Sequence, residues 1–423
     1  MLSSVKNFFI KAVNSPDIRK KLLITALVLF VFRLFAHIPA AGIDKKSLSA
    51  LFQGSPLLSL LDVFSGGTLA NFSIMALGLN PYITSSIILQ LLTYVVPSLE
   101  ELSKEGEYGQ EKINQYTRFL TVPLAILQGF AMYTLLRSQN IVPLLAPIQI
   151  FSLILTMTAG TMLAVWLGEL ITEYAFKNGV SFLIFAGIAS RLPVTIGQSL
   201  SIFQPQDLIK ILIFVVIGIV MIGLIIFVSE AQRIIPIQYA RKASGLSSQL
   251  PLRVNSAGVV PIIFAVSLVL LPYFATQFLA GLPNRQLVYI SNKISSLLAP
   301  QSLVYNIIYF FLVVGFTFFY TSVVFNTEKV SENLQKSGGF IPGIRPGHES
   351  AKYLAFVLNR ITLIGAVFLG FIAILPSFFQ KTIGVSNLAI GGTGILIVVS
   401  VVLEVAREIE GELLMKSYER FLS

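Results

Sequence analysis

Few side chains in this sequence could carry out covalent or metal chemistry. The 423 residues include no cysteine, which excludes disulfides, thiolate metal sites and thiol nucleophiles, and they include two histidines, His37 and His348. Neither histidine has a catalytic partner nearby in the sequence, and no HExxH motif occurs. No Gly-rich phosphate-binding loop with its lysine is found either, so energy must come from a partner. We therefore predict no catalysis, no cofactor and no metal site.

The composition indicates a polytopic membrane protein. Hydrophobic residues make up 55% of the chain and charged residues 12%, against about 25% charged residues in a soluble protein. The mean hydropathy is +0.81. The basic N-terminal arm lacks the apolar core and cleavage site of a signal peptide, so none is expected. A net charge of +10 need not indicate nucleic acid, because membrane proteins concentrate Lys and Arg in cytoplasmic loops.

Hydropathy and chain breaks predict ten membrane spans of about 20 residues each. They cover residues 22–38, 71–97, 117–136, 149–170, 181–200, 209–229, 257–275, 303–325, 354–375 and 386–406. Arg191 interrupts the fifth span, and Arg33 and His37 share one face of the first. If the N-terminus is cytoplasmic, 21 of the 30 Lys and Arg residues fall in cytoplasmic segments. The positive-inside rule therefore predicts that both termini are cytoplasmic.

Ten spans divide evenly into halves of five, residues 1–208 and 209–423. An odd number of spans in each half means that the halves, if they are repeats, are inverted, with the functional site at their interface. A secondary transporter with inverted repeats is the main alternative, but that class needs an ionisable group at the bilayer midplane. The acidic residues Glu169, Glu230 and Glu404 fall near predicted cytoplasmic ends instead, which argues against a transporter.

Residues 57–99 form an apolar run that is too long for one span. The pair Gly66 and Gly67 breaks it early, and Pro81 lies in its middle. The first part, residues 57–70, is too short to cross a bilayer, which favours a re-entrant helix. Such a segment survives at membrane depth only inside protein or along a cavity. An amphipathic surface helix followed by an ordinary span stays open as the alternative.

Two predicted cytoplasmic loops, residues 229–255 and 326–353, are long, basic and rich in turn residues. Clustered charge beyond the membrane indicates a docking site for a partner. Positive-inside topology alone would explain the charge but not the length, because a simple connection needs only a few residues.

Seven stretches spread over nearly the whole chain carry characteristic motifs. They are RLFAHIPAAGID (33–44), FSGGTLANFSIMALGLNPYITSSIILQLL (64–92), KEGEYGQEKINQYTR (104–118), EAQRIIPIQYARK (230–242), NSAGVVPIIFA (255–265), GGFIPGIRPGHESAKY (338–353) and GGTGILIVVSVVLE (391–404). Each stretch alone is a weak motif, but together they are highly specific. The chain resembles the SecY family, the main subunits of bacterial and plastid protein-conducting channels.

The resemblance implies an all-α membrane fold of ten transmembrane helices, in two pseudo-symmetric inverted halves of five around an hourglass pore. It implies a short re-entrant plug helix over residues 57–70. The function that follows is a channel that translocates unfolded secretory polypeptides and releases signal and transmembrane helices laterally into lipid. The plug residues implied are Leu58, Leu61, Phe64, Ser65, Gly66 and Gly67.

The resemblance also implies a ring of branched apolar side chains at the pore waist. Its members are Ile83, Ile87, Ile184, Ile188, Ile263 and Ile397. Two pairs in this set are spaced four residues apart, so each pair lines one helix face, and a hydrophobic constriction blocks ions by dewetting. The alternative is that these isoleucines face lipid or pack the helix bundle.

In the family the second and seventh spans separate to release a signal helix. The candidates for a polar seam along this lateral gate are Thr84, Ser86, Gln90, Gln128 and Asn255. Interhelical hydrogen bonds of this kind contribute roughly 0.6–2 kcal/mol each, which is weak enough to open on binding. The alternative is that these side chains only satisfy helix packing.

The resemblance places Arg345 in a loop tip that meets the SecA ATPase or the ribosome. Arg241 and Lys242 belong to the same predicted surface, where exposed basic tips would bind ribosomal RNA phosphates. The alternative for any one of them is a solvated topogenic charge. The other implied partners are SecE-like and SecG-like small membrane subunits, signal peptides, nascent chains and membrane lipids. The implied location is the bacterial plasma membrane or the thylakoid membrane, with the termini cytoplasmic or stromal.

Overall fold

The structure is a computed structural model that describes residues 14–40, 62, 65, 67–69, 71–138, 142, 145–201, 208–239, 248–280, 285–299, 302–383 and 392–422. The chain divides into two compact units. The first comprises Met1–Phe203, Ser267–Ser302 and Val385–Ser423, and the second comprises Gln204–Val266 and Leu303–Gly384. The two units are defined by their contacts and not by repeat symmetry, so the division into inverted halves near residue 208 stays a prediction.

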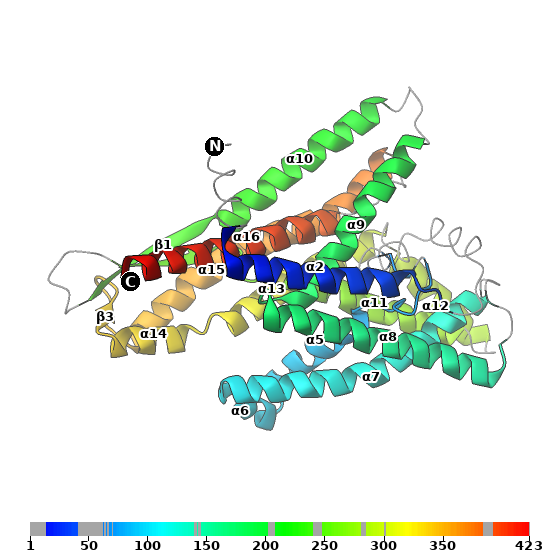
Figure 1. Cartoon of the computed structure of the whole chain (residues 1–423), viewed down its shortest axis with the longest axis horizontal. Coiled ribbons are helices and arrows are strands. Elements are labelled where there is room, and N and C mark those ends of the chain that lie inside the picture. Colours follow the sequence, from blue (N-terminus) through cyan, green and yellow to red (C-terminus); the bar gives the residue numbers. More distant parts are fainter. Residues whose placement is uncertain are drawn as a thin grey trace. The chain divides into compact units, whose positions relative to one another are not determined.

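The first unit is a bundle of helices that pack side by side. Its α7 contacts both α5 and α8, α8 also contacts α2 and α9, and α16 contacts α9 (Figure 1). The C-terminal part of α11 (Val260–Ala280) belongs to it too. The other helices are α2 Pro16–His37, α5 Asn80–Val95, α6 Pro97–Lys104, α7 Glu107–Ser138, α8 Pro147–Tyr174, α9 Gly179–Ser201, α12 Arg285–Leu297 and α16 Gly392–Leu422.

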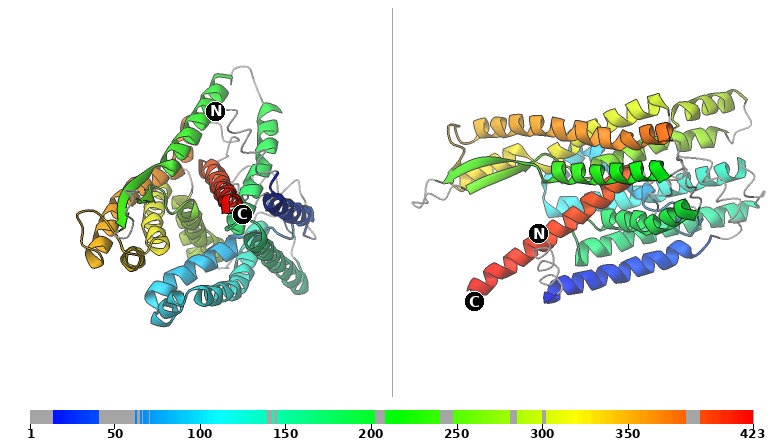
Figure 2. Two further views of the ribbon diagram at one scale, coloured as in Figure 1. Left: turned by 60° about the vertical axis from the view of Figure 1, so that its left-hand side comes forward. Right: turned by 90° about the horizontal axis from the view of Figure 1, so that it is seen from above.

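The second unit joins long helices to a small sheet. Helix α13 packs along α15, and α14 packs on α15 as well. The sheet is antiparallel with strand order β2-β1-β3, and Figure 2 shows its β1–β2 hairpin continuing beyond the end of α10. The elements are α10 Leu208–Glu230, β1 Gln232–Tyr239, β2 Ser248–Arg253, α13 Leu303–Val324, α14 Thr327–Lys336, β3 Gly339–Phe340 and α15 His348–Ile383.

The sheet occupies segments that the sequence analysis treated as loops, so the described chain is not purely helical. Along β1, Ile235 and Ile237 are buried and alternate with exposed residues, which is the period of a half-buried strand. Ile235 packs with Leu252, Ile341 and Leu354 in one apolar cluster. This cluster fixes both predicted loops, residues 229–255 and 326–353, to the start of α15.

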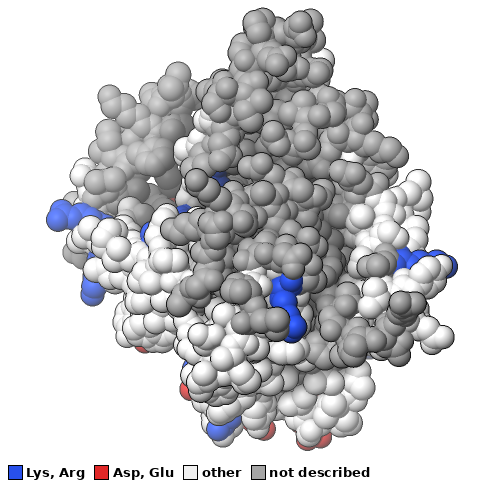
Figure 3. All heavy atoms as spheres, turned by 90° about the vertical axis from the view of Figure 1, so that its right-hand side faces the viewer, with Lys and Arg blue, Asp and Glu red and all other residues white. Residues whose placement is uncertain are grey.

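A helix overlaps each of the ten predicted spans. Within the described ranges, four helices are long and apolar enough to cross a membrane, or five if α5 and α6 form one bent span. Large apolar side chains are exposed on the described helices, as Ile219 and Phe227 on α10 are. Figure 3 shows separate Lys, Arg, Asp and Glu side chains among the described atoms of one face. The structure therefore shows several apolar helices, and the number of membrane spans stays a proposal.

Helix α5 is shorter than the predicted second span, because residues 71–79 form turns and the helix begins at Asn80. Pro81 lies in its first turn, where a missing backbone N–H costs nothing. At the other end Val96 is extended, as expected for a residue that precedes proline, and Pro97 starts α6. The two helices therefore meet at a bend of 101°.

Candidate functional site

All six predicted ring residues are described, and the side chain of each is buried. Ile83 and Ile87 lie on α5, while Ile184 and Ile188 lie on α9. Helix α9 packs against α16, which carries Ile397, and α8 joins α5 to α9 by contacting both. These five side chains belong to the first unit and Ile263 belongs to the second. Burial is what a closed constriction requires, but their pore role stays a prediction.

The predicted plug lies mostly outside the described residues, which include Ser65 and Gly67 but not Leu58, Leu61, Phe64 or Gly66. The described residues of this segment, which are residues 62, 65 and 67–69, are buried, and we call them the plug turn after the predicted plug. The Gly67 N–H donates to the Asp62 carbonyl at 2.8 Å, and the Ser65 hydroxyl donates to the same carbonyl at 3.1 Å. The Thr68 hydroxyl donates to the Ser65 carbonyl at 2.8 Å. The described residues of the plug turn are therefore joined to one another by their own polar groups.

An ion pair that the sequence analysis missed connects this turn to α9. The Asp62 carboxylate, 1% exposed, pairs with the guanidinium of Arg191, which is one-third exposed. Arg33 of α2 reaches the same region and donates to the Ala186 carbonyl of α9 at 3.4 Å. The interruption of the fifth span by Arg191 was the one sequence signal for this cluster, because an arginine within a membrane helix needs a partner.

The segment after the turn is fixed to the end of α2. Pro39 and Ser73 form an isolated antiparallel bridge, and the flanking bonds run from the Ala40 N–H to the Phe72 carbonyl at 2.8 Å and from the Ile74 N–H to the Ile38 carbonyl at 3.0 Å. Short backbone pairing of this kind satisfies polar groups that lipid cannot. The plug turn is thus held by α9 on one side and is followed by a fixed strand-like segment.

The polar atoms of the predicted lateral-gate residues differ in whether they have a hydrogen-bond partner. Thr84 donates to the Asn80 carbonyl at 2.9 Å and Gln90 donates to the Ser86 hydroxyl at 3.1 Å, so these bonds stay within α5. In contrast, Gln90, Gln128 and Asn255 each have a buried side-chain oxygen with no hydrogen-bond partner among the described residues. A buried amide oxygen without a partner is unfavourable. A polar seam therefore stays a prediction that these three oxygens support.

The predicted docking loop is described at Arg345, whereas Arg241 and Lys242 lie outside the described residues. Arg345 is exposed at the tip of a turn between β3 and α15. Its own carbonyl accepts a bond from the Ser350 hydroxyl at 3.0 Å, and the Gly347 carbonyl accepts one from Ser331 at 2.7 Å. Hydrogen bonds therefore fix the backbone of the tip, while Arg345 itself is exposed.

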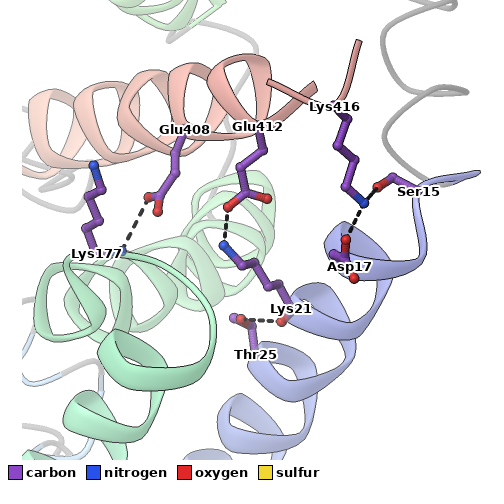
Figure 4. A network of polar contacts seen from close by, with 8 residues as sticks. All are labelled: Ser15, Asp17, Lys21, Thr25, Lys177, Glu408, Glu412 and Lys416. Atoms are coloured by element: carbon purple, nitrogen blue, oxygen red, sulfur yellow. Dashed lines mark hydrogen bonds and ion pairs between the residues drawn. The ribbon is translucent and has the colours of Figure 1, made fainter. Parts of the chain in front are cut away.

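A second polar network joins the C-terminal helix to the start of the chain (Figure 4). Lys416 of α16 pairs with Asp17 of α2 and donates to the Ser15 hydroxyl at 3.0 Å. Lys21 pairs with Glu412, one turn earlier on α16. Lys416 lowers the pKa of the Asp17 carboxyl by donating a hydrogen bond and by its positive charge. The network fixes the last turns of α16 to α2, and no spacing rule in the sequence predicts it.

The histidines have no catalytic arrangement in the described chain. The His37 Nδ1 lies 2.8 Å from the Arg33 carbonyl of its own helix, and His348 is exposed at the start of α15. Among the described residues, no group of three His, Cys, Asp or Glu side chains could hold a metal ion.

The fold is that of solved protein channels. A structure described as "The structure of a protein conducting channel" matches with a TM-score of 0.68 and 18% identity, over 96% of this chain and 94% of that one. A structure of Sec61 in the canine ribosome-channel complex matches with a TM-score of 0.65 and 17% identity, over the same shares. The chain therefore shares the fold of these proteins.

Sequence comparison gives the family. The SecY family model matches residues 73–406. The protein translocase subunit SecY of Streptomyces scabiei is 43% identical, over 98% of this chain and 99% of that protein. The subunit of Corynebacterium glutamicum is 42% identical over the same shares. The chain belongs to the SecY family, and it is an integral membrane protein.

Proposed function

We propose that this chain is the pore-forming subunit of a channel that moves unfolded secretory polypeptides across the bacterial plasma membrane. The observation that carries the proposal is the identity to bacterial protein translocase subunits over nearly the full length. The proposal includes ten spans in two inverted halves, cytoplasmic termini and no catalytic activity of its own. A secondary transporter is not favoured, because the related proteins are translocase subunits.

The closed channel in this proposal is sealed by the six isoleucines and the plug turn. Branched, uncharged side chains exclude water from a narrow passage and so block ions, yet they hold no group that would bind a passing peptide. All six are buried, and hydrogen bonds join the described residues of the plug turn to one another. A solved structure at a TM-score of 0.67 is described as one in which the SecY plug domain stabilises the closed state and maintains a membrane seal.

The lateral exit in this proposal is a polar seam at Gln90, Gln128 and Asn255. Their buried oxygens have no partner among the described residues, so a hydrogen-bond donor that reaches them gains the full value of a desolvated bond. In this proposal a donor brought by a signal helix, or by the opposing helix, forms bonds of roughly 0.6–2 kcal/mol each at these oxygens, which are weak enough to be replaced when the gate opens.

The driving partner in this proposal docks on the exposed tip at Arg345. The related Sec61 structure is that of a ribosome-channel complex, and exposed arginines suit both RNA phosphates and protein carboxylates. We propose the ribosome, a SecA-type ATPase and small SecE-like and SecG-like membrane subunits as partners, with signal peptides and nascent chains as substrates. Arg241 and Lys242 extend the docking surface.

The test is precursor transport into vesicles that contain the purified channel complex and the ATPase partner. Replacing Arg345→Glu inverts the charge at the tip and should abolish transport, while the chain still inserts into the membrane. The matched control is Lys336→Glu, a charge inversion at another exposed residue of the same loop region, which should transport normally. Equal loss in both variants, or loss of insertion in Arg345→Glu, would contradict a docking role.

A further inference from the structure

The ion pair of Asp62 with Arg191 joins the plug turn to α9. In the proposed channel, α9 belongs to the wall and the plug turn moves when the channel opens. Asp62 and Arg191 are 129 positions apart, and both belong to the first unit. A carboxylate that is 1% exposed loses nearly all of its hydration, so it stays ionised only where a cation compensates for that loss. In the described structure Arg191 provides the compensation.

Arg191 also contacts the far end of the same turn. Gly67 has a φ of +83°, and a Cβ added there would lie 2.7 Å from the Arg191 Nε. The guanidinium therefore lies directly against the Gly67 backbone while it binds the Asp62 carboxylate. Because the Gly67 N–H bonds to the Asp62 carbonyl, the arginine contacts both residues of this hydrogen bond.

A second arginine strengthens the positive potential at this place. Arg33 of α2 donates to the Ala186 carbonyl of α9, which lies five residues before Arg191 on the same helix. Two guanidinium groups in a protein interior repel each other, and an anion near both offsets that repulsion. The α2–α9 pair therefore has the chemistry of a carboxylate-binding site.

We propose that Arg191, with Arg33 beside it, forms a carboxylate site on the channel wall, and that Asp62 of the plug turn is its resident ligand in the closed state. The inference rests on the proposed channel function and deepens it. Opening must then break a buried ion pair, and closing must re-form it. The pair thus acts as an electrostatic latch, and Asp62 and Arg191 are positioning residues for the plug.

The first test is ion leak through the idle channel complex in vesicles, without a precursor. Asp62→Asn keeps the shape of the side chain but removes its charge, so the ion pair with Arg191 is lost. Removing one partner of a buried pair is strongly unfavourable, and the partial exposure of Arg191 reduces the effect. We expect the leak to rise by about tenfold to a hundredfold. The control is Arg118→Gln, which breaks the ion pair of Arg118 with Glu169 at 2.6 Å between α7 and α8 and should leave the leak unchanged.

The second test separates the ion pair from general damage. Arg191→Lys keeps the positive charge and should leak much less than Arg191→Gln. The double variant Asp62→Asn with Arg191→Gln should leak no more than the leakier single variant, because both changes remove the same interaction. Leaks that multiply in the double variant, or an Asp62→Asn channel that stays sealed, would overturn the latch. If Asp62→Asn fails to insert, equal leaks in Arg191→Lys and Arg191→Gln overturn it.

The same vesicles distinguish failure of the latch from failure of the channel function. The unmodified complex is tested for precursor transport alongside the leak measurements. Transport by the unmodified complex together with unchanged leak in the variants would refute the latch alone. Absence of transport by the unmodified complex, when a reference translocase is active in the same assay, would refute the proposed function.

Discussion

Gly160 lies where helix α8 comes closest to the segment between the plug turn and α5. A Cβ added to Gly160 would lie 2.1 Å from the Ile74 carbonyl oxygen and 2.7 Å from its carbonyl carbon, whereas ordinary contacts are 3.4–4 Å. Ile74 has little freedom to withdraw, because its N–H bonds to the Ile38 carbonyl at 3.0 Å. Met75 and Ala76, which follow it, are fully buried. The substitution Gly160→Ala must therefore displace backbone.

The change in stability caused by Gly160→Ala is the sum of two opposing contributions. Overpacking a tight site costs typically about 1–3 kcal/mol, and a backbone clash at this distance belongs at the upper end, at about 2–3 kcal/mol. Replacing glycine by alanine inside a helix returns about 1 kcal/mol. The net loss of stability is then about 1–2 kcal/mol.

The control is Gly218→Ala on α10, where no described atom lies within 4 Å of the added Cβ. That variant has the gain in helix propensity without the clash, so the two substitutions should change stability in opposite directions. The assay is thermal unfolding of the purified complex in detergent, with ion leak as a second measurement. Gly160→Ala should melt below the unmodified complex and leak more. If it melts at or above Gly218→Ala, the close approach of α8 to Ile74 is wrong.

Two further predictions concern the pore and the C-terminal helix. Ile83→Asn should raise ion leak in vesicles because a polar side chain lets water into the constriction, whereas Ile83→Leu should stay sealed, and equal leaks would refute the ring. Lys416 lowers the pKa of Asp17, so their pair stabilises α16 at any pH above the ordinary carboxyl value of about 3.9 and is lost as pH falls through the lowered value. Limited proteolysis of the unmodified chain should therefore release the end of α16 only below about pH 4. In Lys416→Met the same release should occur at neutral pH. If the variant and the unmodified chain are cleaved alike at both pH values, the pair is not formed.

Hydropathy predicted the helices well because a bilayer imposes one length and one polarity on every crossing segment. The ends were harder to predict where long-range pairing decides them. The second helix begins at Asn80 and not at residue 71, because Ser73 pairs with Pro39, and no local pattern reports that bridge. The strand β1 had a usable signal in the alternation of Ile235 and Ile237, but the two-residue β3 had none.

The candidate site was predictable as far as family motifs reach. They led to six buried isoleucines and to the exposed Arg345. They did not lead to the Asp62–Arg191 pair, because two charges 129 positions apart have no spacing rule and meet only when α9 folds against the plug turn. The available signal was Arg191, which interrupts a predicted span. An arginine inside a span needs a partner, and Asp62, which borders the apolar run of residues 63–99, was an acidic candidate.

The polar groups of this apolar chain also indicate which parts can move. Many buried hydroxyls donate to the carbonyl four residues earlier on their own helix, as Thr84, Thr117 and Thr317 do. A helix that shifts as a rigid body carries such bonds with it, so they neither resist nor favour opening. The pair of Asp62 with Arg191 is different, because it spans two segments and must break when they separate. In the proposed channel, opening therefore carries the cost of breaking such contacts between segments, so a single substitution at Asp62 or Arg191 should change that cost.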